Sequence, residues 1–223
     1  MQFIQGLRLS KNPRLAFVGA GGKTTAISIL AKEMLTPVIV TTTTHLGSWQ
    51  TNIADRHIIL ESNSDLKKID PLFDGITLVT EVPESNRLIG LNTERIQLLH
   101  EFCEKHNLPL IIECDGSRQL PIKAPGPNEP VIPDFVDTVV VMAGLSGLNK
   151  PLTKLVVHHV EIYSDICNME ENQTISIESQ TRLLSHKQGG LKNIPPQARR
   201  LLILNQADTT LLQSQSFMIA HQL

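Results

Sequence analysis

A glycine-rich segment near the N-terminus has the residue types and spacing of a phosphate-binding loop. It reads Gly19-Ala20-Gly21-Gly22-Lys23-Thr24-Thr25 and lies between the apolar run 15–18 and the amphipathic segment 26–31. Glycines let successive backbone N–H groups surround an anion, and a following helix presents its partial positive charge to the same point. Lys23 would contact phosphate oxygens, and the Thr24 hydroxyl would bind a magnesium ion. The segment therefore predicts a nucleotide site made of residues 19–25.

The spacing of this loop departs from the common phosphate-loop pattern. That pattern has a glycine five residues before the Gly-Lys pair, and Phe17 occupies this position. What remains is the shortened form G-x-x-G-K-T, which several nucleotide-binding families use, including the Mur ligases. The alternative is a glycine-rich turn that binds nothing. The order of strand, loop, lysine, threonine and helix favours the nucleotide site.

Two acidic residues end a predicted strand in the middle of the chain. Glu113 and Asp115 follow the apolar run 110–112, and open α/β sheets place ligand-contacting groups at such strand ends. Alternation puts both carboxylates on one face if the strand continues through Asp115. We predict that Asp115 binds the magnesium ion, with Glu113 as the second candidate for the metal or for activating a water molecule. The alternative is that one of the acids caps a turn.

Four consecutive threonines, residues 41–44, end another predicted strand at the same edge. Hydroxyl groups that face the loop would bind the γ-phosphate, order a water molecule or complete the coordination of magnesium. Strand propensity and a local turn explain each single threonine equally well. We predict that Thr43 or Thr44 lies beside the γ-phosphate or the attacking water.

A proline-rich segment, residues 116–134, follows the acidic strand. It contains five prolines and two glycines, which predicts a long irregular loop of the kind that often carries function. Arg118 and Lys123 would close over the nucleotide and hold phosphate or an anionic substrate. Solvated surface charge is the alternative for both residues. Glu129, between prolines, is a positioned carboxylate whose partner the sequence does not identify.

The segment Asn205-Gln206-Ala207-Asp208 follows a predicted strand over residues 200–204. GTPases have N-K-x-D at the corresponding point, where the aspartate accepts hydrogen bonds from guanine. An unpaired buried polar group costs about 1–3 kcal/mol, so Asp208, with Asn205 beside it, would favour guanine over adenine. Because Gln206 replaces the lysine, the segment does not determine which base is bound. The alternative role of Asp208 is to cap the last helix.

Composition limits the class of protein. The chain has 223 residues, 41% hydrophobic residues and a formal net charge of −2, which predict one globular domain without a nucleic-acid or membrane surface. Its three cysteines show no metal or disulfide spacing. His158 and His159 lie on a predicted helix, where neighbours face about 100° apart, so we expect them not to share a metal. With no apolar leader or membrane-spanning run, we expect a soluble, cytoplasmic protein.

Runs rich in valine and isoleucine alternate with helical patterns, which predicts an α/β fold: a three-layer, P-loop NTPase-like domain with a mainly parallel sheet. The predicted strands are Leu15–Val18, Pro37–Thr42, His57–Leu60, Ile76–Thr80, Leu110–Cys114, Asp137–Met142 and Arg200–Leu204. The predicted helices are Lys23–Leu35, Thr93–His106, Leu152–Cys167, Glu178–Gln188 and a short one after Asp208.

Six tracts of the chain, between about residues 10 and 210, together resemble one known family. They are Gly-Ala-Gly-Gly-Lys-Thr-Thr, Thr-Thr-Thr-Thr-His, Glu-Cys-Asp-Gly-Ser-Arg, Pro-Ile-Lys-Ala-Pro, Glu-Pro-Val-Ile-Pro and Leu-Asn-Gln-Ala-Asp, in this order. In this they are similar to the YqeC family, accessory proteins of selenium-dependent molybdenum hydroxylases. Two positions differ from the family: Gln206 stands where members usually have lysine, and Asn128 stands where a histidine often occurs.

The resemblance implies a nucleotide-binding maturation factor that acts beside the enzymes preparing or inserting the molybdenum cofactor. We therefore expect Mg²⁺ and ATP or GTP as ligands, slow hydrolysis of the nucleotide, and a molybdenum hydroxylase or its maturation proteins as partner. Two alternatives belong to other classes. One is a Mur-like ATP-dependent ligase or transferase, and the other is a scaffold in which bound nucleotide only controls affinity for a partner.

Overall fold

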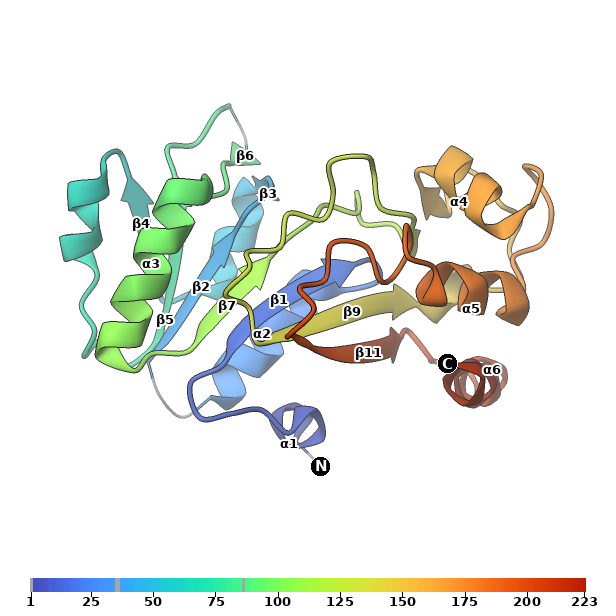
Figure 1. Ribbon diagram of the computed structural model, residues 1–223, viewed down its shortest axis with the longest axis horizontal. Coiled ribbons are helices and arrows are strands. Elements are labelled where there is room, and N and C mark those ends of the chain that lie inside the picture. The colour runs from blue at the N-terminus through green and yellow to red at the C-terminus, as the bar shows by residue number, and fades with distance from the viewer. Residues whose placement is uncertain (1, 35–36, 86) are drawn as a thin grey trace.

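The computed structural model describes residues 2–34, 37–85 and 87–223 (Figure 1). Within these residues, seven parallel strands form a central sheet in the order β11-β9-β1-β7-β2-β5-β4. The strands are β1 Arg14–Gly19, β2 Val38–Thr42, β4 Arg56–Leu60, β5 Ile76–Glu81, β7 Leu110–Glu113, β9 Thr138–Gly144 and β11 Arg199–Asn205. All seven predicted strands are therefore confirmed, and the α/β class with them.

Helices α2 (Lys23–Glu33) and α3 (Thr93–His106) cover opposite faces of this sheet (Figure 1). Each face has its own apolar core, since Phe17 of β1 belongs to the same buried cluster as Leu30 of α2, whereas its neighbour Ala16 belongs to that of Leu99 of α3. A strand buried on both faces reads as a continuous apolar run, which is why the strands were readable in the sequence.

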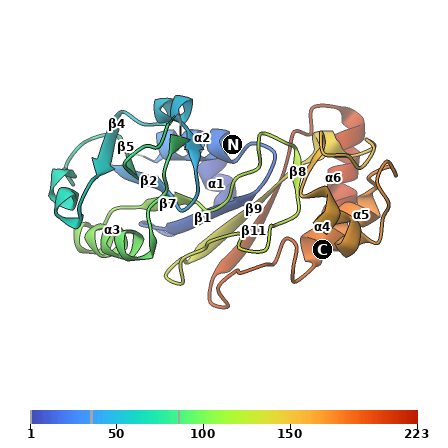
Figure 2. The ribbon, with the colours of Figure 1, turned by 90° about the horizontal axis from the view of Figure 1, so that it is seen from above.

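The remaining elements lie around the sheet. Helices α4 (Val160–Cys167), α5 (Ile177–Ser185) and α6 (Thr210–Gln222) gather at one end of the molecule (Figure 2), and α1 (Phe3–Leu7) packs on α2. Two small ribbons pair β3 (Leu46–Gly47) with β6 (Arg87–Leu88), and β8 (Ile122–Lys123) with β10 (Val157–His158). Short 3₁₀ turns span Ser48–Ile53, Asn63–Lys68 and Leu145–Gly147. None of the described helices has the length and apolar character needed to cross a bilayer.

The predicted helix Leu152–Cys167 is wrong in its first half. Its observed part, α4, begins at Val160. Before it, residues 153–156 form a turn and Val157–His158 form β10, whose backbone pairs with β8: the N–H of Ala124 donates to the carbonyl of His158 at 3.1 Å. His159, with φ of 61°, then turns the chain into the helix. Pairing with a strand some 35 residues away overrode the local helical pattern.

The other predicted helices are present with shifted ends. Helix α3 has the predicted bounds, and α2 is described to Glu33, with the predicted end at Leu35 outside the described residues. Helix α5 ends at Ser185 because the N–H groups of His186 and Gly190 both donate to the carbonyl of Leu183. Helix α6 is 13 residues long rather than short. The proline-rich loop is irregular except for β8.

The strand order places a change of direction at β1. From β1 the chain passes through α2 to β2 on one side, and the last two strands of the sheet, β9 and β11, lie on the other side. In open parallel sheets, such a switch point leaves a crevice beyond the carboxyl ends of the strands, where ligands bind. The phosphate-loop motif directly follows β1, so the topology and the motif indicate the same place.

Candidate functional site

The strand ends that carry the predicted site residues meet at one edge of the sheet. Gly19 of β1 is level with Met142 of β9, and Thr42 of β2 is level with Glu113 of β7. Beyond this edge lies a cleft of about 820 Å³. Its lining includes Lys23, Thr24, Thr44, Glu113, Arg118 and Gln206. The volume is in the range of small-molecule sites.

The glycine loop has a backbone that only glycine adopts easily. Gly19, Gly21 and Gly22 have φ of 93°, 83° and 111°. At Gly21 an added Cβ would lie 2.4 Å from the Cα of Gly144, so even alanine would collide with the backbone of the neighbouring strand end. The glycines thus serve the close packing of the loop as well as its shape.

The amide groups of the loop divide into two sets. The N–H of Gly19 donates to both carboxylate oxygens of Asp115 at 3.0 Å, and that of Ala20 donates to the carbonyl of Met142 at 2.9 Å. By contrast, no acceptor among the described residues receives a hydrogen bond from the amides of residues 21–25. Four of these five residues, 22–25, line the cleft. The amides of the helix start are therefore available to an anion in the cleft.

Lys23 lies at the bottom of the cleft with its ammonium group surrounded by acceptors. Its side chain is 2% exposed, and Nζ lies 2.6 Å from the carbonyl of Gly19, 3.2 Å from Asp115 and 3.9 Å from Glu113. Burial by itself lowers the pKa of Lys23, but the two carboxylates outweigh it and raise the pKa above its ordinary value. Lys23 is thus a fixed cation beside the free amides.

Thr24 and Glu113 are hydrogen-bonded neighbours at the cleft. The Thr24 hydroxyl donates to Oε2 of Glu113 at 3.0 Å and accepts from the amide of Gln50 at 2.6 Å. Burial raises the pKa of Glu113, although Lys23 opposes this shift. Gln50, whose Oε1 also accepts from the N–H of Gly47, is a site residue that the sequence analysis missed. It carries no motif, and only the fold places it beside the loop.

Asp115 and Lys123 are buried behind the loop, and neither is on the lining of the cleft. Asp115 is 1% exposed and lies between two ammonium groups, that of Lys23 and that of Lys123 at 3.0 Å. Lys123 also contacts the carbonyl of Gly116 and, at 2.8 Å, Oε2 of Glu129. The chain leaves β7 at Glu113, so the strict alternation assumed for Asp115 does not continue. Lys123 joins the proline-rich loop to Asp115 instead of extending over the cleft.

The threonine tract is divided between backbone contacts and the cleft. The hydroxyls of Thr41 and Thr42 donate to the carbonyls of Val79 and Glu113, at 2.7 and 2.8 Å. The Thr43 hydroxyl donates to the carbonyl of Val131 at 2.8 Å. Of the four, Thr44 is the one that lines the cleft. Arg118 also lines it and is exposed, as the predicted anion contact requires.

Asn205 supports the loop from the end of β11. Its side-chain amide donates to the carbonyl of Gly21 at 2.7 Å. Gln206, with φ of 60°, lines the cleft, and its Oε1 accepts from the hydroxyl of Ser146 at 2.6 Å. Asp208 is exposed and is not part of the cleft lining, and the cap of α6 is Thr209, whose hydroxyl accepts from the N–H of Leu212.

These positions lead to a prediction about base selectivity. We expect Asp208→Ala to leave the ratio of the dissociation constants for GTP and ATP unchanged to within about twofold, because this exposed side chain does not reach the cleft. Calorimetric titration of both nucleotides into both forms of the protein measures the ratio. A loss of selectivity in the variant would instead restore the guanine-contact role predicted for Asp208 from the N-Q-x-D segment.

Comparison with known proteins places the chain in a family. The profile of the YqeC protein family matches residues 15–161, which include the phosphate loop, the acidic strand and the proline-rich loop. The chain belongs to the YqeC family. It is 28% identical over 211 residues to the uncharacterized protein YqeC of Escherichia coli strain K12, across 90% of this chain and 80% of that protein. No solved structure gives a significant match.

Family membership confirms the resemblance seen in the six tracts. The matched range covers some of the predicted site residues and not others. It contains every predicted site residue from Gly19 to Lys123, whereas Asn205 and Asp208 lie beyond its end. In this YqeC-family chain the N-Q-x-D segment is therefore the basis of the base-contact prediction, and the family match adds no support to it. The phosphate-loop prediction stands on the residues, the topology and the free amides together.

The sequence did not predict one cluster of side chains that can bind a metal. His158 and His159 do not share a helix, because His158 ends β10 and His159 caps α4. Their rings stack at 3.9 Å, next to Glu129 of the proline-rich loop. The expectation that the two histidines face apart is therefore wrong, and the reason is the strand pairing that displaces the start of the helix.

Proposed function

We propose that this protein binds a magnesium nucleoside triphosphate in the cleft beyond the carboxyl ends of β1 and β7, and hydrolyses it slowly. The observation that carries the proposal is the row of five amides, residues 21–25, that lack acceptors among the described residues next to the Lys23 ammonium. Backbone N–H groups and one ammonium group at a helix start form a strong binding site for phosphate.

The residues at the cleft fit a magnesium ion. The Thr24 hydroxyl and the Glu113 carboxylate are already in contact and line the cleft, and Mg²⁺ prefers such oxygen ligands together with phosphate oxygens. Bound there, the ion would neutralise phosphate charge during hydrolysis. Asp115, the first candidate from the sequence, has its carboxylate engaged by two lysines and the Gly19 amide, so Glu113 is the stronger proposal for the metal.

Slow turnover agrees with the side chains available to an attacking water. Of the two predicted threonines, Thr44 lines the cleft, whereas the Thr43 hydroxyl is engaged by the carbonyl of Val131. A threonine hydroxyl orients water but is a poor general base at neutral pH, because it does not ionise in that range. We therefore assign Thr44 the task of positioning the water.

A binding panel tests this proposal directly. ATP, GTP and CTP are titrated into the purified chain with Mg²⁺ and again with a chelator, and phosphate release is followed at saturation. We expect at least one nucleotide to bind with a dissociation constant below about 100 μM in the presence of Mg²⁺. Absence of binding by all three would overturn the proposal. Binding without phosphate release would favour a scaffold that senses nucleotide. Phosphate release that needs an added acceptor would indicate a ligase or transferase.

Glu113→Gln tests the assignment of the metal ligand. The variant keeps the size of the side chain and an oxygen for the Thr24 hydroxyl but removes the negative charge. We expect the gain in nucleotide affinity on adding Mg²⁺ to fall by about tenfold, with the Mg²⁺-free affinity unchanged. The control is Glu171→Gln, an exposed carboxylate outside the cleft lining. Equal Mg²⁺ dependence in both variants would remove Glu113 from the metal site.

We infer, from the resemblance of the six tracts, that nucleotide binding serves the maturation of selenium-dependent molybdenum hydroxylases. The match to the YqeC family supports the resemblance from which this inference is drawn. The test uses cells that lack the protein and supplies them with the wild-type chain or with a variant that does not bind nucleotide. Hydroxylase activity is then measured. Full activity with either form, or without the protein, would contradict the role.

A further inference from the structure

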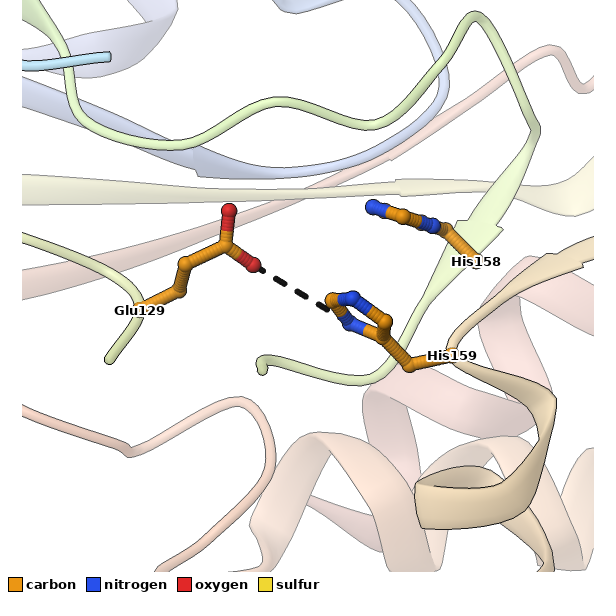
Figure 3. Close-up of side chains that lie close together, drawn as sticks. All are labelled: Glu129, His158 and His159. Atoms are coloured by element: carbon orange, nitrogen blue, oxygen red, sulfur yellow. Dashed lines mark ion pairs between the residues drawn. The ribbon is translucent and has the colours of Figure 1, made fainter. Parts of the chain in front are cut away.

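Three side chains with metal-ligand chemistry meet on the wall of the cleft. Glu129 comes from the proline-rich loop, and His158 and His159 come from the end of β10 and the start of α4 (Figure 3). One ligand atom from each residue lies within 4.8 Å of the others. Glu129 and His158 line the cleft itself. The cluster thus joins two segments about 30 residues apart at one accessible point.

The carboxylate of Glu129 has one oxygen engaged and one open. Its Oε2 accepts from the Lys123 ammonium at 2.8 Å and from the N–H of Gly126 at 3.3 Å. Its Oε1 has no hydrogen-bond partner in the described part of the chain. Lys123 is also paired with Asp115, so its charge is shared between two carboxylates. The group is therefore held in place with a free oxygen.

The two histidines also present open nitrogen atoms. Nδ1 of His159 lies 2.9 Å from the carbonyl oxygen of Ala124, and since that oxygen can only accept, Nδ1 carries the hydrogen and, in the neutral ring, Nε2 keeps its lone pair. The same Nδ1 lies 4.0 Å from Oε2 of Glu129 (Figure 3). A hydrogen bond from the second ring nitrogen to a carbonyl is the usual support of a metal-binding histidine. The ring of His158 makes no hydrogen bond with any described residue.

We propose that Glu129, His158 and His159 bind a divalent transition-metal ion of the zinc class, with a coordination position open to the cleft. Two imidazoles and a carboxylate suit Zn²⁺ and its neighbours in the series rather than Mg²⁺, which prefers oxygen. Ligands of a tetrahedral zinc ion lie about 3.4 Å apart, so modest rotations complete the site. The His159 side chain is 31% exposed, which leaves room for its ring to move toward Glu129, whose position Lys123 fixes.

A position open to the cleft defines the class of molecule that the metal would contact. Sites with three protein ligands leave the fourth place for water or for a donor atom of a bound molecule. This site differs from the magnesium site in its ligands, because Thr24 and Glu113 offer only oxygen. The proposal does not depend on nucleotide binding, so its test uses the metal alone.

The experiment titrates Zn²⁺ into chelator-treated protein by calorimetry and Co²⁺ by visible absorption. We expect one Zn²⁺ per chain with a dissociation constant below about 10 μM, and a Co²⁺ spectrum typical of nitrogen and oxygen ligands. His158→Gln should weaken Zn²⁺ binding by about tenfold or more. Because this side chain makes no hydrogen bond with described residues, we expect the variant to fold, which thermal unfolding will check.

The matched control is His45→Gln. His45 is an exposed histidine that lines the same cleft but lies outside the cluster. We expect its replacement to leave Zn²⁺ affinity unchanged. Equal loss in both variants would mean nonspecific binding by cleft histidines, and absence of Zn²⁺ binding by the wild-type chain would mean that the cluster is not a metal site. Either result overturns the proposal without affecting the nucleotide site.

Discussion

Lys23→Ala is expected to weaken nucleoside triphosphate binding by about a hundredfold or more. The variant removes the ammonium group at the bottom of the cleft, next to the free amides of the loop. Hydrogen bonds to charged groups contribute about 1.5–3 kcal/mol each, so the loss of one strong contact with a phosphate oxygen accounts for a change of this size. Calorimetry with Mg²⁺ and the nucleotide that binds the wild-type chain most tightly measures it.

The matched control for this variant is Lys32→Ala. Lys32 lies on the same helix, but its side chain is exposed. The control should retain wild-type affinity, because the lost charge is distant from the loop and is screened by solvent. Circular dichroism establishes that both variants are folded. An unchanged dissociation constant in folded Lys23→Ala would contradict the nucleotide site as a whole.

Asp115→Asn is expected to destabilise the protein by about 3–5 kcal/mol. Asp115 is 1% exposed and is paired with Lys23 at 3.2 Å and Lys123 at 3.0 Å. Removing one partner from a buried ion pair is strongly destabilising, and here two ammonium groups lose their shared carboxylate, which leaves Lys23 with Glu113 and Lys123 with Glu129. The Gly19 amide also loses its charged acceptor. The free energy of unfolding from urea titration measures the effect.

Asp134→Asn is the control for the loss of a negative charge. Asp134 lies at the end of the proline-rich loop that follows Asp115 but is exposed, so its replacement should change the free energy of unfolding by less than about 0.5 kcal/mol. The pair of variants also distinguishes two roles of Asp115. A stability close to wild type, with loss of Mg²⁺-dependent nucleotide binding, would show that Asp115 binds the metal, as the sequence analysis predicted.

The central sheet was predictable because its inner strands are buried on both faces. Runs such as Leu110–Glu113 are apolar over almost their whole length, and the glycine loop and the acids directly follow such runs. In a parallel sheet the carboxyl ends of the strands share one edge, so the site residues had to converge there. The position of the glycine loop at the end of β1 followed from local patterns.

The parts that were not predicted depend on contacts between distant segments. The pairing of β8 with β10 replaced the first half of a predicted helix and brought His158 and His159 beside Glu129. The bend after Glu113 separated Glu113, at the cleft, from Asp115, behind the loop. No periodicity within a single segment records such contacts, because they depend on which surfaces the fold brings together.

The balance of charge behind the loop has a consequence for how the proposed nucleotide would reach the cleft. Lys23 and Lys123 already face the carboxylates of Glu113, Asp115 and Glu129, so the floor of the cleft has no surplus of cations to attract a polyanion from a distance. Long-range attraction falls instead to the exposed arginines at the rim, Arg87 and Arg118. Electrostatic steering is thus weak, and the rate of capture should vary little with ionic strength.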